Sequence, residues 1–92
     1  MDVEFDEPGH RFVMHQPNGD GELRFHGPEN GVIDLYHTEV DPALRGEGIA
    51  AALAEGAFEY ARAHGLKVKV TCPYVLEWLE RHPAERDLVV AR

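Results

Sequence analysis

An alanine-rich stretch with helical spacing lies between two apolar segments that alternate like β-strands, and this order restricts the folds open to the chain. Between residues 48 and 64 apolar side chains recur at intervals of three and four; they include Ile49, Leu53, Ala57 and Tyr60. This spacing predicts a helix with one buried face, which ends at Gly65. Val32–Val40 precedes the helix as a strand, and Leu66–Cys72 follows it. Such a unit forms a right-handed crossover between two parallel strands.

The residues before this unit have the pattern of short antiparallel strands. Apolar side chains alternate with polar ones in three places: at Val3 and Phe5, at Phe12 and Met14, and at Leu23 and Phe25. Residues 17–21 and 28–31 are rich in Pro, Asn and Gly, which predicts turns between these strands. Val32–His37 is the most apolar segment of the series, so we expect it to be a central strand.

The last quarter of the chain predicts a second helix and a short final strand. Pro73 suits the first position of a helix over Tyr74–Arg81, whose buried stripe would be Val75, Trp78 and Leu79. Pro83 ends that helix, and Asp87–Ala91 is apolar enough for an edge strand. We therefore expect one domain over residues 1–92, with an α+β fold. Its mostly antiparallel sheet of five or six strands would contain a central pair of parallel or nearly parallel strands and carry two helices.

Charge and composition exclude several classes of protein. The net charge of −8 disfavours nucleic acid as a partner, because such binding depends on basic patches. The longest apolar run, Ile49–Leu53, is far too short for a membrane span, and residues 1–4 lack the basic and apolar regions of a signal peptide. Cys72 is the only cysteine, and the histidines show no metal-ligand spacing. We expect a cytoplasmic protein with no metal and no membrane partner.

The loop between the first strand of the unit and its helix has the composition of a phosphate site. Gly46 and Gly48 flank one residue at the entry to the helix, so consecutive backbone N–H groups can converge on one anion. Arg45 adds a positive charge with a fork suited to phosphate. A tight strand-to-helix turn is the other interpretation of the same glycines. The loop is neither a dinucleotide-binding fingerprint nor a P-loop.

The order of several motifs resembles a known superfamily. Arg45–Ala50 is similar to the Q/R-x-x-G-x-G/A motif of the GCN5-related N-acetyltransferases, with Ala50 in the last position. Other segments resemble the compact single-domain branch of that superfamily over roughly residues 10–91. These segments are His37–Val40, Ala61–Val68, Cys72–Val75, Arg81–Pro83 and Asp87–Val89.

This resemblance implies an acetyl-CoA site in the cleft between two diverging strands. The backbone of Glu39 and Val40 would pair with the pantetheine arm, within a site that includes Leu44–Ala51. The pyrophosphate would be held by Arg45, Gly46, Glu47, Gly48, Ile49 and Ala50. The resemblance also implies a catalytic pair, because the residues that match His37 and Cys72 are the proposed pair of the compact branch.

The residues themselves leave the chemistry open between two routes. His37 and Cys72 lie near the carboxyl ends of neighbouring strands, where ligands of such sheets bind. His37 could help to generate a Cys72 thiolate that takes the acetyl group, or His37 or Glu39 could act as the base for direct transfer. Tyr74 could serve as a general acid or pack against Trp78, and we predict packing.

We therefore expect an acetyl-CoA-dependent N-acetyltransferase that acts on an amine, either a small molecule or a protein lysine. The alternative is a CoA- or acyl-CoA-binding module without catalysis, and a third possibility is an interaction domain that keeps only the fold. The expected partner is an amine acceptor whose identity the sequence does not specify. We expect a monomer or a weak homodimer.

Overall fold

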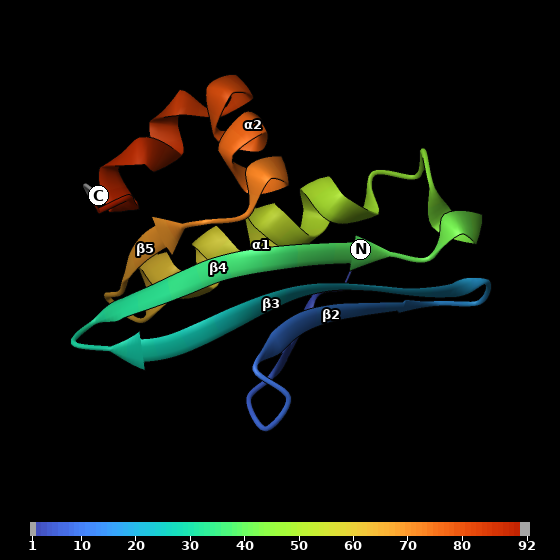
Figure 1. Cartoon of the computed structure of the whole chain (residues 1–92), viewed down its shortest axis with the longest axis horizontal. Coiled ribbons are helices and arrows are strands. Elements are labelled where there is room, and N and C mark those ends of the chain that lie inside the picture. Colours follow the sequence, from blue (N-terminus) through green and yellow to red (C-terminus); the bar gives the residue numbers. More distant parts are fainter. Residues whose placement is uncertain (1, 91–92) are drawn as a thin grey trace.

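The computed structural model describes residues 2–90, which form one mixed β-sheet and its covering helices (Figure 1). The sheet has five strands in the order β1-β2-β3-β4-β5, and every pair is antiparallel except β4–β5, which is parallel. The strands are β1 (Glu4–Asp6), β2 (Arg11–Gln16), β3 (Gly19–Glu29), β4 (Val32–Val40) and β5 (Lys67–Val70). The helices are α1 (Ile49–Ala63) and α2 (Pro73–Arg81), and the 3₁₀ turns are η1 (Pro42–Leu44) and η2 (Pro83–Leu88).

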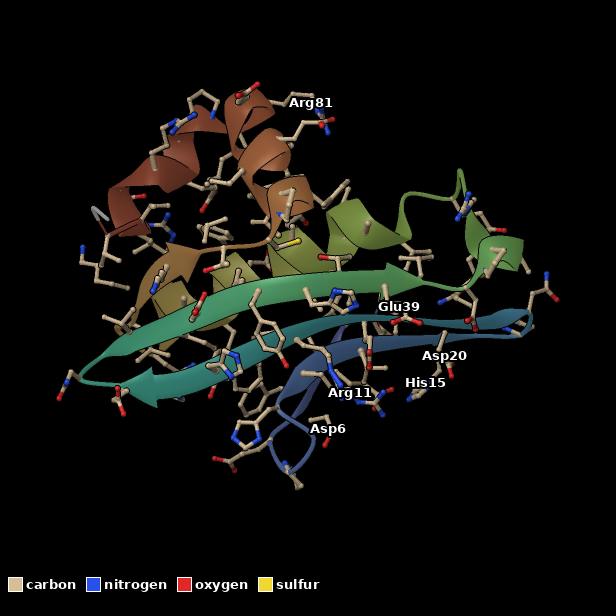
Figure 2. All side chains as sticks on the ribbon, in the orientation of Figure 1. Asp6, Arg11, His15, Asp20, Glu39 and Arg81 are labelled. Atoms are coloured by element: carbon tan, nitrogen blue, oxygen red, sulfur yellow. The ribbon has the colours of Figure 1, made fainter. Side chains whose placement is uncertain are left out.

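The predicted α+β fold with a crossover helix between parallel strands is confirmed. Helix α1 buries the face that its spacing predicts, including Leu53 and Ala57, and lies behind the sheet in Figure 1. Helix α2 packs beside α1, where the rings of Phe58 and Trp78 lie 5.3 Å apart. The opposite face of the sheet carries polar side chains such as Arg11 and Glu39 (Figure 2).

Strands β4 and β5 separate part of the way along β4. Their paired register ends at Leu35, whose carbonyl oxygen accepts hydrogen bonds from the N–H groups of Thr71 (2.9 Å) and Cys72 (3.0 Å). The chain then turns away into α2, while β4 continues to Val40. Within residues 2–90, no strand pairs with Tyr36–Val40 on the side that β5 occupies. This is the splay that we predicted, although β5 lies at the edge of the sheet rather than in its centre.

The predicted final edge strand is reduced to one bridge to β5. Residues 83–88 form η2, and a single bridge between Val68 and Val89 is the only sheet-like pairing beyond it in the described part of the chain. Arg62 on α1 explains this arrangement, because its guanidinium hydrogen-bonds the carboxylates of Glu85 and Asp87 at 2.9 Å and holds the segment against the helix. Ala91, the last residue of that predicted strand, lies outside the described residues.

The turns of the N-terminal half are tighter than we predicted. Strand β3 begins at Gly19 and continues through Pro28 and Glu29, so that only Asn30 and Gly31 remain in the turn before β4. Among residues 2–90 no polar or charged residue is buried, and none of the helices is long and apolar enough to cross a membrane.

Because of the contact between Arg62 and Asp87, we expect part of the stability of the fold to be lost at acidic pH. The hydrogen bond from Arg62 lowers the pKa of Asp87 below its usual value of 3.8. Because the carboxylate has a lower pKa in the folded state than in the unfolded state, its ionised form stabilises the fold at pH values above the unfolded-state pKa. This stabilisation is lost as the pH falls through the folded-state pKa. We expect Asp87→Asn to melt at a lower temperature than the unmodified chain at pH 7. The two melting temperatures should converge as pH falls below about 4, and a constant difference down to pH 2 would contradict this role.

Candidate functional site

In the loop between β4 and α1, the N–H groups of Arg45 and Glu47 donate to carbonyl oxygens of the preceding 3₁₀ turn, whereas those of Gly46 and Gly48 make no backbone hydrogen bond within residues 2–90. Gly46 and Gly48 adopt left-handed conformations with φ of 83° and 75°, which side chains of other residues disfavour. Gly48 is the N-cap of α1, and no side chain caps this helix end. The first N–H groups of a helix have no partner within the helix, and they lie at the positive end of its dipole. The loop therefore has the backbone geometry of an anion site.

A cleft of about 270 Å³ opens beside this loop. It is lined by Val40, Leu44, Arg45, Gly46, Gly48, Ile49, Ala50, Ala51 and Tyr74. Arg45 is exposed and forms no ion pair with any of residues 2–90, so its charge is available to a ligand. The cleft thus joins the loop that carries Arg45 to the C-terminal end of β4, where that strand has lost its neighbour β5.

Most of the residues predicted to bind the cofactor lie together in this cleft, but two do not line it. The side chain of Glu39 lies on the open face of the sheet, 69% exposed, although its backbone belongs to the unpaired part of β4. Glu47 is exposed in the loop and does not line the cleft.

Tyr74 lines the cleft and packs against the buried core that includes Trp78, but its ring forms no stacked pair with the Trp78 ring within residues 2–90. The Trp78 ring contacts two other rings, Phe58 at 5.3 Å and His82 at 4.2 Å between centroids. Tyr74 occupies the first turn of α2 and faces Arg45 and Ala50 across the cleft instead. Pro73 begins α2 directly after β5, which brings this ring to the place where the two strands part.

The two predicted catalytic residues lie on opposite faces of β4. His37 is opposite Arg24 in the register, on the open face, where its Nε2 lies 3.3 Å from Oε1 of Glu39. Thr38 is opposite the buried Leu23, on the face that α1 covers. There its hydroxyl lies 3.2 Å from Sγ of Cys72, whose residue is only 3% exposed. The structure therefore brings Cys72 to Thr38 and not to His37.

A β-bulge causes this separation. Arg24 and Phe25 are adjacent in β3, but their partners in β4 are His37 and Leu35, so that Tyr36 is an extra residue. The bulge inverts the alternation of β4: Leu35 faces α1 before it, and Thr38 faces α1 after it. An uninterrupted strand would have placed His37 on the same face as Leu35. Thr38 was missed for this reason, because nothing in the local sequence marks the bulge.

The part of the chain that the structure describes contains no group of three or more His, Cys, Asp or Glu residues that could hold a metal ion. The site therefore consists of a backbone anion nest, one free guanidinium, an open strand edge and the Tyr74 ring. Such an arrangement can bind an extended, phosphate-bearing ligand whose amide groups pair with β4.

Comparison with known proteins identifies the class. The model of the family GCN5-related N-acetyl-transferase matches residues 11–88, and the chain belongs to this family. The resemblance that Arg45–Ala50 predicted is thereby confirmed.

Named relatives cover part of the chain. Protein NATD1 of Gallus gallus is 40% identical over 57 residues, which are 62% of this chain and 52% of that protein. Human Protein NATD1 is likewise 40% identical over 57 residues, or 50% of its length. The chain thus spans about half the length of the curated relatives it matches. The NMR structure of a GCN5-like protein from Staphylococcus aureus shares the fold, with a TM-score of 0.74 and 24% identity over 99% of this chain and 89% of that one.

Proposed function

We propose that the chain is an acetyl-CoA-dependent N-acetyltransferase that acetylates an amine on a small molecule or a protein lysine. The single observation that supports this function is the cleft of about 270 Å³, in which the nest at Gly46 and Gly48 meets the unpaired end of β4. Arg45 and the loop through Ala50 would hold the pyrophosphate, and the backbone of Glu39 and Val40 would bind the pantetheine arm. The chemistry that acetyl-CoA supplies is an acetyl group activated as a thioester.

The positions of the side chains favour direct transfer over a cysteine route. Cys72 is buried and does not line the cleft, and its thiol already contacts the Thr38 hydroxyl. His37 does not line the cleft either, but it is half exposed in the part of β4 that β5 leaves unpaired, where an incoming amine has free access. We assign it the role of general base, with the carboxylate of Glu39 orienting its imidazole. Tyr74 lines the cleft, and in this proposal its hydroxyl would donate a proton there.

A second function, a CoA-binding module without catalysis, is favoured by one observation. His37 and Cys72 lie on opposite faces of β4, so that the pair which the resemblance implies does not assemble. The binding cleft does not depend on either side chain. The two functions therefore share the cofactor site and differ in the role of His37.

A comparison of His37→Ala with Cys72→Ala tests the proposal. We expect both variants to keep CoA binding, measured as a rise in melting temperature; CoA at a hundred times its dissociation constant stabilises a fold by about 2.7 kcal/mol. Acetylation of an amine panel, measured by mass spectrometry, should fall by about 100-fold or more in His37→Ala, because it removes the base. Cys72→Ala should turn over as fast as the unmodified chain. The acetyl-enzyme adduct, measured as intact mass, should not decrease in this variant, because Cys72 does not carry the acetyl group.

His15→Ala is the matched control. His15 is a second exposed histidine beside a carboxylate, with Nδ1 at 2.8 Å from Asp20 Oδ1, but it lies on β2, which β3 separates from β4, and it does not line the cleft. It should leave turnover unchanged. CoA binding without turnover in the unmodified chain would establish the binding module instead, and the absence of a melting shift at millimolar CoA would overturn both functions.

A further inference from the structure

Three rows of facing side chains cross from β3 to β4 on the open face of the sheet. Taken along β3, these rows are Glu22 with Glu39, Arg24 with His37, and His26 with Tyr36. The first two rows are register pairs, and in the third the two rings stack with 3.9 Å between their centroids. Directly opposite residues of an antiparallel pair have Cβ atoms about 4.5–5.5 Å apart. The proposed base His37 therefore has Arg24 as its cross-strand neighbour.

The guanidinium of Arg24 is incompletely paired. Its Nε atom is buried and makes no hydrogen bond within residues 2–90. The ion-pair partner of this atom is Oε2 of Glu22, at 3.6 Å, which is too long for a hydrogen bond. The other carboxylate oxygen of Glu22 accepts a hydrogen bond of 2.9 Å from Nη1 of Arg11, which also binds Asp6. Glu22 is thus bound by Arg11, and Arg24 keeps a donor for another acceptor.

Arg24 differs in this respect from two other arginines of the chain. Arg11 and Arg62 each hydrogen-bond two carboxylates at 2.9 Å. A buried donor without an acceptor is rare in folded proteins, and 38% of the Arg24 side chain is exposed, so that a ligand can reach it. A guanidinium offers its donors in a planar fork that suits a carboxylate. Arg24 is therefore placed to bind a carboxylate group of a ligand beside His37.

The charges around Arg24 favour a ligand that carries an amine as well as a carboxylate. Glu22 and Glu39 face each other in the next row, and the net charge of the chain is −8, so a simple anion would be repelled. Glu39 lies 3.3 Å from Nε2 of His37. An ammonium group beside Glu39 and a carboxylate beside Arg24 would each meet the opposite charge. The side chain of a protein lysine supplies only the first of these groups.

A hollow of about 220 Å³ adjoins these rows on the same face. It is lined by Arg11, Asp20, Gly21, Glu22, Glu39 and Asp41. Figure 2 shows that Arg11, Asp20 and Glu39 lie together on this side of the sheet. Glu22 and Glu39 belong both to this lining and to the row next to Arg24 and His37. The hollow therefore leaves room beside that row for the remainder of a small ligand.

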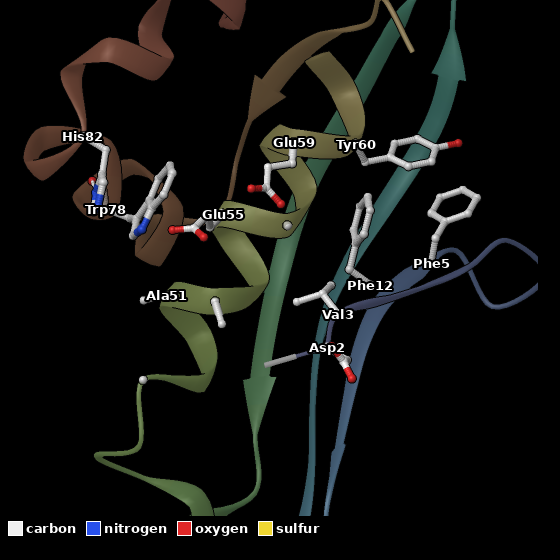
Figure 3. A pocket seen from close by; sticks show the side chains of 13 residues that line it. Asp2, Val3, Phe5, Phe12, Ala51, Glu55, Glu59, Tyr60, Trp78 and His82 are labelled. Carbon is white, nitrogen blue, oxygen red and sulfur yellow. Dashed lines mark hydrogen bonds between the residues drawn. The ribbon is translucent and has the colours of Figure 1, made fainter. Parts of the chain in front are cut away.

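A larger groove, of about 660 Å³, lies beside α1 and does not lead to His37 (Figure 3). Val3 and Trp78 line it from opposite sides of the helix. It belongs to the face of the sheet that α1 covers, whereas Arg24 and His37 lie on the open face. An acceptor for His37 has to bind on the open face.

We propose that Arg24 binds the carboxylate of the acceptor, so that the acceptor is a small amino carboxylate such as a free amino acid. The amine of this molecule would lie at His37 and Glu39, and its carboxylate at Arg24. The inference rests on the proposed function, because it names the acceptor class for that reaction and adds no chemical step. It selects a small molecule over a protein lysine.

The Nε–H signal of Arg24 in a heteronuclear NMR spectrum reports carboxylate binding directly. The probes are glycine, β-alanine and γ-aminobutyrate, titrated with and without CoA, and each is compared with its own amide, which lacks the carboxylate charge. We expect at least one amino carboxylate to shift this signal saturably and its amide to bind about tenfold more weakly, because a charge-assisted hydrogen bond is lost. The amides have the more positive charge, so the net charge of the chain alone would favour them.

Arg24→Gln identifies the signal, which is missing from its spectrum. Measured on the His37 ring signals, this variant should bind the amino carboxylate about tenfold more weakly. Arg81→Gln is the matched control, because Arg81 has a similarly long ion pair, 3.5 Å from Glu77, but lies on α2 away from this face (Figure 2). It should bind as the unmodified chain does. During turnover, Arg24→Gln should raise the KM of the amino carboxylate about tenfold and leave that of its amide unchanged.

Several outcomes would overturn the inference. These are no shift with any amino carboxylate, equally tight binding of the amides, and equally tight binding of acetate, which would make Arg24 a simple anion site. All three use the unmodified chain and do not depend on how a variant folds. Unchanged affinity in Arg24→Gln, or equal weakening in Arg81→Gln, would also contradict it. Because the titration needs no acetyl transfer, it can succeed where the proposed function fails. Acetylation of amines without a preference for carboxylates would refute this inference alone.

Discussion

The double variant Gly46→Val/Gly48→Val will bind CoA about 100-fold more weakly than the unmodified chain. Both positions have positive φ, 83° and 75°, where a side chain costs about 1–2 kcal/mol per residue. The variant avoids this cost by moving its backbone out of the left-handed region, which disperses the N–H groups of the nest. A loss of about 2–4 kcal/mol corresponds to a weakening of roughly 30- to 1,000-fold. Isothermal titration calorimetry measures the change.

Gly31→Val is the control for this experiment. Gly31 has a similar φ of 79° and equally open surroundings, but it lies in the turn between β3 and β4, at the opposite end of β4 from the cleft. This variant should lose thermal stability and keep its CoA affinity. An unchanged affinity in the double variant would show that the loop is only a tight turn, which is the other interpretation of its glycines.

Leu53→Ala will destabilise the fold by about 3 kcal/mol, because it leaves a cavity between α1 and the sheet. Leu53 is fully buried at the centre of α1. The sheet opposite offers Gly21, whose missing side chain cannot refill the space; a Cβ there would lie 3.4 Å from Leu53 Cδ1. For a chain of this size the melting temperature should fall by about 12–24 °C, measured by calorimetry.

Leu76→Ala provides the comparison for this loss. Leu76 is the one large hydrophobic residue that is exposed among those described, at 37%, so its truncation should change stability by less than about 0.5 kcal/mol. CoA should restore part of the lost stability of Leu53→Ala, because the cofactor cleft does not include that residue. Equal effects of the two leucine variants would refute the packing of α1 on the sheet.

The sequence predicts those parts of the fold that depend on local periodicity. The spacing of Ile49, Leu53 and Ala57 belongs to one helix face, so the position of α1 and its crossover follow from it. Residues 87–91 have the apolar composition of a strand, but their conformation depends on Arg62, which is distant in the chain and binds Asp87. Composition alone does not reveal a contact between residues so distant in the chain, and within residues 2–90 only one bridge of the predicted strand forms, at Val89.

In the candidate site, too, the features that depend on local sequence were predicted and those that depend on distant contacts were not. The positive φ angles of Gly46 and Gly48 agree with the predicted nest, because glycine is the residue that tolerates such backbone angles. The distance of His37 from Cys72 depends instead on one extra residue, Tyr36, that inverts the faces of β4. A bulge is set by pairing with β3 and has no local signature here. The sequence also did not predict the groove of about 660 Å³ beside α1. Val3 and Trp78, which line it, come from the two ends of the chain, and local patterns do not show that they meet.

The early separation of β4 from β5 also bears on self-association. A strand without a neighbour is a template on which other chains can add strands and aggregate. Here the open edge covers only Tyr36–Val40, and Pro42 soon ends it. His37 and Glu39 place polar groups along this short edge, which discourages the approach of a foreign strand. The same five residues would therefore admit the slender arm of the proposed cofactor while discouraging the approach of another β-sheet.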